Sequence, residues 1–154
     1  MFMADVLTPD ANFEPRVRNS FERQKVMHTL GATLTRVEQG TVEIELPFSE
    51  DLTQQHGFIH AGIISTGLDS ACGYAAYTMM PPEAAVLTVE FKINLLVPAK
   101  GERFLFRGSV TKPGRTILVA DGQAFSYSED GEARLIATMT ATLMTITGRE
   151  GLEG

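Results

Sequence analysis

A single acid, Asp69, interrupts residues 61–79, a segment with no other charged residue. If the segment is a helix, this carboxylate shares one face with small residues: Gly62, Ser65, Thr66, Gly73 and Ala76. Such a face leaves room for another molecule to approach. A carboxylate in these surroundings can act as a general base or as a nucleophile. The simpler alternative is an acid held at an interface by Ser or Thr hydroxyls.

The segment that leads into this helix, residues 54–62, reads Gln-Gln-His-Gly-Phe-Ile-His-Ala-Gly. Its glycines let the backbone turn closely, and the helix start that follows offers unpaired N–H groups at the positive end of the helix dipole. Such a place can hold an oxyanion. The alternative is that these residues only cap the start of the helix and take no part in a reaction. His56 and His60 have no third ligand near them in the sequence, so we predict no metal site.

The composition describes one ordinary domain. The chain has 154 residues, and its 44% hydrophobic content is too high for a disordered protein. The formal net charge of −6 argues against a nucleic-acid partner, which requires a basic face. The lone cysteine, Cys72, cannot form an internal disulfide, and its apolar neighbours predict core packing rather than a nucleophile. No apolar run is long enough to span a membrane and no signal peptide is evident, so we expect a cytoplasmic protein.

The periodicity of apolar residues places the elements around the helix. Residues 14–30 have the pattern of one amphipathic helix, and residues 32–48 have that of a hairpin. Four strands joined by short turns follow residue 85, which suggests an antiparallel meander. The prediction is an α+β fold in which an antiparallel sheet wraps around a long central helix. Its single domain covers 14–147, between an N-terminal tail, 1–13, and a flexible C-terminal tail, 148–154.

Basic residues gather after the central helix. Residues 92–115 contain six Lys or Arg side chains and one acid. One interpretation is a cationic rim for a phosphorylated small molecule, such as a nucleotide or coenzyme A. The alternative is a set of solvated strand faces and loops.

These features together resemble a known family. The chain resembles hotdog-fold acyl-CoA thioesterases of the phenylacetate-pathway (PaaI-like) type. The residues similar to the signature of that family are Gln54, Gly57, His60-Ala61-Gly62 and Leu68-Asp69. The run from Thr88 to Glu102 also resembles the strand and turn that follow the helix in that family. The resemblance covers about residues 30–147 and implies the hotdog fold. Ala61 stands where many members have the first glycine of His-Gly-Gly, and alanine supplies the same backbone N–H.

The resemblance also implies catalytic roles. Gln54 would orient the thioester or the attacking water, and the Ala61 N–H would polarise the thioester carbonyl. Asp69 would be the base or nucleophile. Thr88 would help to place the nucleophilic water.

Substrate binding is assigned in the same way. His60 and Gly62 belong to the binding loop, without a proton-transfer role. Coenzyme A would run along the turn that contains Lys112, Gly114 and Arg115. Because coenzyme A is part of the substrate, no cofactor is expected.

A distance argument predicts self-association. Ala61 and Asp69 are separated by about 12 Å along one helix, too far to act on the same thioester. Two antiparallel copies of the helix would bring Ala61 of one chain near Asp69 of the other. We therefore expect a homodimer, and the resemblance extends this to a dimer of dimers, a homotetramer.

Two other functions remain open. The first is a hotdog-fold hydratase or dehydratase acting on hydroxyacyl thioesters, although such sites generally pair a histidine with an acid and no histidine follows His60. The second is a non-catalytic acyl-CoA-binding module, for which Asp69 would be unnecessary.

Overall fold

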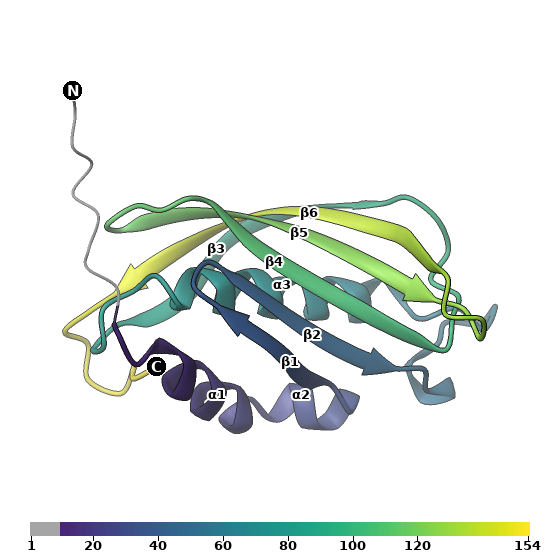
Figure 1. The fold of residues 1–154 in the computed structure, drawn as a ribbon, viewed down its shortest axis with the longest axis horizontal. Helices are drawn as coiled ribbons and strands as arrows, with labels where there is room; N and C mark the ends of the chain where they lie inside the picture. The colour runs from purple at the N-terminus through teal and green to yellow at the C-terminus, as the bar shows by residue number, and fades with distance from the viewer. Residues whose placement is uncertain (1–9) are drawn as a thin grey trace.

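A six-stranded antiparallel sheet curves around one long helix in the computed structural model, which describes residues 10–154 (Figure 1). The elements in chain order are α1 (Phe13–Arg23), α2 (Lys25–Leu30), β1 (Thr33–Glu38), β2 (Thr41–Pro47), η1 (Glu50–Leu52), α3 (Ala61–Tyr77), β3 (Ala85–Leu95), β4 (Arg103–Lys112), β5 (Ile117–Tyr127) and β6 (Ala133–Ile146). The predicted fold class is confirmed. No helix among the described residues is long and apolar enough to cross a bilayer.

The core lies between α3 and the concave face of the sheet. The buried side of the helix carries Ile64, Leu68, Ala71, Cys72 and Ala75. Opposite them, alternate residues of β2 and β5 are buried, as the period of two in a strand requires, and β4 buries Phe104, Leu105 and Phe106 in succession. The other side of α3 remains at least partly exposed and carries Gly62, Ser65, Thr66 and Asp69. The helix is therefore fixed to the sheet along one side, while the first part of its small-residue face stays accessible. Gly73 and Ala76, which were predicted to lie on the same face, are buried.

Close helix–sheet contact depends on Gly108 in β4. A Cβ atom at this position would lie 2.3 Å from the backbone oxygen of Ala71, so the backbones of β4 and α3 would have to separate. Overpacking of this kind typically destabilises a protein by about 1–3 kcal/mol. We expect Gly108→Ala to lower the free energy of unfolding by about 2 kcal/mol or more in urea denaturation.

Gly73→Ala provides the matched control on α3. A Cβ atom at Gly73 meets nothing within 4 Å. Because alanine is favoured over glycine inside a helix, this change should stabilise the protein by roughly 0.5–1 kcal/mol. A Gly108→Ala protein as stable as the wild type would show that the backbones of β4 and α3 can separate at little cost.

The N-terminal helix differs from its prediction. Residues 14–30 form two helices, because Gln24 adopts an extended conformation with ψ of 93°. Its side-chain oxygen accepts a hydrogen bond from the Ser70 hydroxyl at 3.2 Å, which ties the kink to α3. The kink lets Val17 and Phe21 of α1 and Met27 of α2 all be buried. The predicted end of the helical segment at residue 30 is correct, and Gly31, which follows it, has a φ of 75°.

The predicted meander is only partly correct. Strands β4, β5 and β6 are neighbours in sequence order, but β3 pairs with β6 at the far edge of the sheet. The connection through residues 96–102 therefore passes from the edge strand β3 beyond β6 and β5 to β4, and is too long for a tight hairpin turn. The strand that follows α3 thus becomes an edge strand.

The predicted tails are described only in part. Most of the segment 1–13 lies outside the described residues, and α1 already begins at Phe13. The segment 148–154, which was expected to be flexible, folds back beside α1 and α3. There an Arg23 guanidinium nitrogen donates a hydrogen bond to the Gly154 backbone oxygen.

Candidate active site

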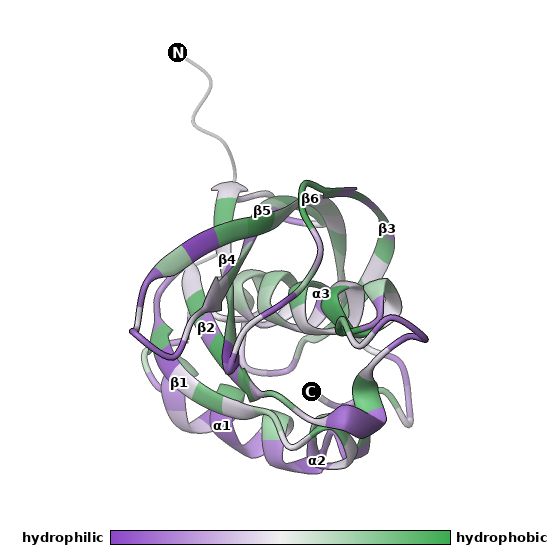
Figure 2. Cartoon of the chain, turned by 90° about the vertical axis from the view of Figure 1, so that its right-hand side faces the viewer, coloured by the Kyte–Doolittle hydropathy of each residue, from purple (hydrophilic) through white to green (hydrophobic). Residues whose placement is uncertain are grey.

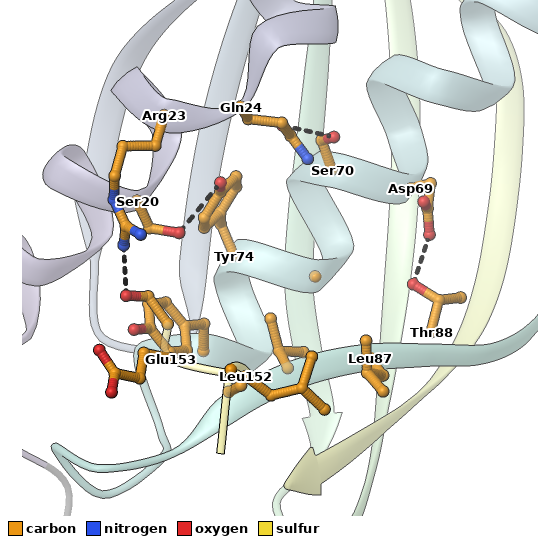
Figure 3. A pocket seen from close by; sticks show the side chains of 16 residues that line it. Ser20, Arg23, Gln24, Asp69, Ser70, Tyr74, Leu87, Thr88, Leu152 and Glu153 are labelled. Carbon is orange, nitrogen blue, oxygen red and sulfur yellow. Dashed lines mark hydrogen bonds between the residues drawn. The ribbon is translucent and has the colours of Figure 1, made fainter. Parts of the chain in front are cut away.

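Asp69 faces Thr88 across the gap between α3 and β3. The Thr88 hydroxyl donates a hydrogen bond to Asp69 Oδ1 at 2.8 Å, as Figure 3 shows. The β3–β6 register shifts between Thr88 and Glu90, so a bulge lies next to the threonine. Bulges commonly re-aim a side chain beside a functional site. The fold thus brings together two residues that are 19 positions apart in the sequence.

A pocket of about 350 Å³ opens beside this pair. Residues from α1, α3, β3 and the C-terminal segment line it: Ser20, Arg23, Gln24, Asp69, Ser70, Gly73, Tyr74, Tyr77, Ala85, Val86, Leu87, Thr88 and the residues 151–154. No motif in the sequence points to Ser20, Arg23 or Gln24, because their only signal is a place on the polar side of an amphipathic helix. Leu152 was not predicted either, since it lies in the segment expected to be flexible.

The loop before α3 is held by its own backbone. The Gln54 N–H donates to the Phe58 oxygen at 2.8 Å, and the Gly57 N–H donates to the Gln54 oxygen at 3.0 Å. Gly57 has a φ of 83°, which favours glycine at this turn. The Gln54 side-chain oxygen accepts a hydrogen bond from the His56 N–H, which leaves the side-chain NH₂ as the group that can donate to a ligand.

The start of α3 offers one N–H donor. The His60 ring nitrogen Nδ1 accepts from the Gly62 N–H at 2.8 Å and so caps the helix. The Gly62 N–H is therefore already engaged, whereas no acceptor for the Ala61 N–H occurs among the described residues. This geometry leaves Ala61, not Gly62, as the donor at the positive end of the helix dipole.

Within one chain the predicted site residues form separate groups. Ala61 and Asp69 are about 12 Å apart along α3. The β4–β5 turn with Lys112, Gly114 and Arg115 lies at the opposite end of the sheet from the 54–62 loop (Figure 1). The two ends are separated by the length of β4, about 30 Å. A single chain therefore does not assemble all the predicted residues.

Two of the six basic residues in the predicted cationic rim form ion pairs with acids of the neighbouring strand. Arg103 donates to Glu45, and Arg107 donates to Glu43, each at 2.7 Å, across the β2–β4 pair. These ion pairs make Arg103 and Arg107 part of a strand face rather than of a phosphate site. Lys112 is exposed at the β4–β5 turn. Gly114 has a structural reason to be glycine, since a Cβ atom there would lie 2.0 Å from the Ile117 oxygen.

Cys72 is a core residue, as its neighbours predicted. Its side chain is fully buried, and burial, with smaller effects of Asp69 and Asp121, raises the pKa of the thiol to about 12. A thiol that stays protonated is a poor nucleophile. Within residues 10–154, no three His, Cys, Asp or Glu side chains lie close enough together to hold a metal ion.

Comparison with known proteins places these features in a family. The sequence profile of the Thioesterase superfamily matches residues 56–133. A thioesterase family protein from Silicibacter pomeroyi is 60% identical and superposes with a TM-score of 0.87, covering 89% of this chain and 100% of that one.

More distant structures share the fold. A thioesterase from Haemophilus influenzae is 18% identical with a TM-score of 0.77, covering 95% of this chain and 98% of that one. The PaaI protein of the E. coli phenylacetic acid degradation operon is 16% identical with a TM-score of 0.78, covering 88% and 94%.

A sheet wrapped around one long helix is the hotdog fold that the signature residues implied, and the Haemophilus influenzae thioesterase and the PaaI protein share it. The chain belongs to the Thioesterase superfamily, and its class is that of the thioester hydrolases.

Proposed function

We propose that the protein is an acyl-CoA thioesterase, which uses water to convert an acyl-CoA into a carboxylic acid and free coenzyme A. The observation that carries the proposal is the Asp69–Thr88 hydrogen bond at the mouth of a pocket large enough for an acyl group. Asp69 is partly exposed, so a water molecule or a thioester carbon can reach it.

The roles follow from what each group can donate or accept. Asp69 either removes a proton from the attacking water or attacks the thioester carbon itself. Thr88 orients the carboxylate. The Ala61 N–H and the Gln54 amide donate hydrogen bonds to the carbonyl oxygen as negative charge develops on it. His60 supports this site by capping α3, and its Nδ1 is already used as an acceptor.

A second copy of the chain completes the site. Strand β3 is a sheet edge, and its side chains Leu87, Val89 and Phe91 are 42–55% exposed. Figure 2 shows hydrophobic colour on this strand, although it lies at the margin of the sheet. A long apolar edge strand requires a partner to avoid aggregation. Antiparallel pairing of two β3 strands about a twofold axis would set the small-residue faces of the two α3 helices against each other.

Such a dimer explains the separation of the site residues. Two antiparallel α3 helices place Ala61 and Gln54 of one chain near Asp69 of the other. The β4–β5 turn of one chain, beyond the C-terminal end of its own α3, then lies on the side of the partner's helix start. Each of the two shared sites would thus receive the Lys112–Arg115 turn as a surface for coenzyme A.

A thiol-release assay tests the proposal. We expect the purified protein to release coenzyme A from at least some members of an acyl-CoA panel that spans aliphatic and aryl acyl groups. Binding of acyl-CoA without thiol release would instead indicate a binding module. Hydration of an enoyl-CoA without thiol release would indicate a hydratase, although no histidine lines the described pocket.

The coenzyme A surface gives a kinetic prediction. We expect the double variant Lys112→Ala, Arg115→Ala to raise KM for acyl-CoA several-fold at low salt, with a smaller change in kcat. Contacts to remote phosphates stabilise the ground state and the transition state alike. Arg103→Ala is the control, because Arg103 is paired with Glu45. An unchanged KM in the double variant would mean that coenzyme A binds elsewhere.

A further inference from the structure

The end of the Asp69 pocket away from the carboxylate contains a buried hydroxyl without a partner. Tyr77 is 1% exposed, and no hydrogen-bond partner for its hydroxyl occurs among the described residues. The ring is held by Arg16, which stacks on it at 4.1 Å and donates to three backbone oxygens, those of Tyr77, Met80 and Pro81. A buried polar group is normally hydrogen-bonded, so this hydroxyl requires an explanation.

A guanidinium lies at the same end. Arg23 extends from α1 and donates to the backbone oxygen of Gly154 (Figure 3). Gly154 also lies against the Tyr77 hydroxyl, because a Cβ atom there would be only 1.8 Å from that oxygen. The last described residue therefore touches both groups, and its oxygen occupies the position of an acceptor for Arg23.

The other charges and polar groups of the pocket are arranged along its length. Asp69 lies at the opposite end from Arg23 (Figure 3), and the side chains of Arg23 and Glu153 are both exposed at the surface. The Tyr74 hydroxyl lies 3.3 Å from the Ser20 hydroxyl on the wall between them. Burial raises the pKa of Tyr74, which keeps this phenol protonated. A molecule in the pocket thus meets a negative charge at one end and a positive charge with hydroxyl groups at the other.

We propose that this pocket selects acyl groups that carry a carboxylate at their far end, bound by the Arg23 guanidinium and the Tyr77 hydroxyl. The proposal rests on the thioesterase function and names its substrate class: coenzyme A monothioesters of dicarboxylic acids. The substrate carboxylate replaces the Gly154 oxygen on Arg23 and supplies the acceptor that Tyr77 lacks. Asp69 repels the same carboxylate, so the substrate binds in one direction, with its thioester at Asp69.

The helix sets the length of the acyl group. Asp69 and Tyr77 are separated by about 12 Å along α3. A medium-length chain bridges this span, whereas malonyl and succinyl groups are too short. Hydrolysis adds water across the C–S bond: the hydroxyl joins the acyl carbon, the sulfur leaves as the thiol of coenzyme A, and the product is a free dicarboxylic acid.

The test compares suberyl-CoA with octanoyl-CoA, which have chains of equal length and differ at the far end. We expect kcat/KM to be about tenfold or more higher for suberyl-CoA, because a charge-assisted hydrogen bond contributes at least this much. Arg23→Gln should reduce the ratio of the two kcat/KM values by about tenfold. Arg23→Lys should retain part of the ratio. Tyr77→Phe, which removes only the hydroxyl, should reduce it several-fold.

Arg18→Gln is the matched control, since Arg18 lies on the same helix but is exposed and paired with Glu14. Its ratio should equal that of the wild type, and thermal melts should confirm that each variant is folded. An unchanged ratio in folded Arg23→Gln and Tyr77→Phe proteins, or a wild-type preference for octanoyl-CoA, overturns the carboxylate site and leaves the thioesterase function standing. Absence of thiol release from the whole acyl-CoA panel overturns the thioesterase function itself.

Discussion

Asp69→Asn is expected to reduce kcat for acyl-CoA hydrolysis by about 10²-fold or more, because an amide can neither accept the proton of the attacking water nor attack the thioester. The substitution keeps an oxygen that can accept the Thr88 hydrogen bond, so the local packing should be preserved. Thiol release under saturating substrate gives kcat. Circular dichroism and a thermal melt establish that the variant is folded.

Asp121→Asn is the control for this experiment. Asp121 is exposed on β5, where its carboxylate accepts hydrogen bonds from Thr111 at 2.6 Å and Thr140 at 3.4 Å, and it does not line the pocket. The same chemical change there should leave kcat near the wild-type value. If Asp69→Asn retains wild-type kcat, the carboxylate has no catalytic role, and the acid is an interfacial residue held by Thr88.

Mixing two inactive variants is expected to restore activity. One chain carries Asp69→Asn. The other carries Gln54→Ala, which removes a donor to the developing oxyanion and should reduce kcat by about 10²–10³-fold. If each site combines Gln54 of one chain with Asp69 of the other, the heterodimer has one site with both lesions and one intact site. A purified heterodimer should then have about half of the wild-type activity per dimer.

Two different affinity tags and co-expression allow the mixed species to be purified. Unfractionated statistical mixing would return roughly a quarter of the wild-type sites, since about half of the dimers would be mixed. A heterodimer of two differently tagged Asp69→Asn chains controls for the effect of the tags. A well-folded mixed dimer no more active than its parents would mean that each site is built within one chain.

Local patterns in the sequence were sufficient to predict the helix, hairpin and loop around Asp69. The stretch around Asp69, which has no other charged residue, is a helix, and the small residues Gly62, Ser65 and Thr66 do share a face with Asp69. The hairpin of β1 and β2 and the loop with Gly57 were also predictable. Helix periodicity, strand alternation and turn chemistry each depend on residues a few positions apart, and for this reason a single sequence reveals them.

The residues of the candidate site were predicted from a family resemblance and not from local patterns. The resemblance of Gln54, Ala61, Asp69 and Thr88 to a family signature named candidates that no periodicity could have named, and the structure places Thr88 on Asp69. It also shows that Gln54 and Ala61 lie away from this pair in the same chain. Their catalytic roles stay predictions until the variants are measured.

Tertiary structure alone decided which distant segments meet. Pairing of β3 with β6 depends on the path that α3 takes across the sheet, and this path is set by packing over the whole domain. The kink at Gln24 lies against Ser70 of α3, and the ion pair between Arg107 and Glu43 follows from their register on neighbouring strands. Arg23 and Tyr77 reach one pocket because α1 packs beside α3. Such contacts join residues tens of positions apart, and the registers and packing angles that create them leave no periodic trace in the sequence.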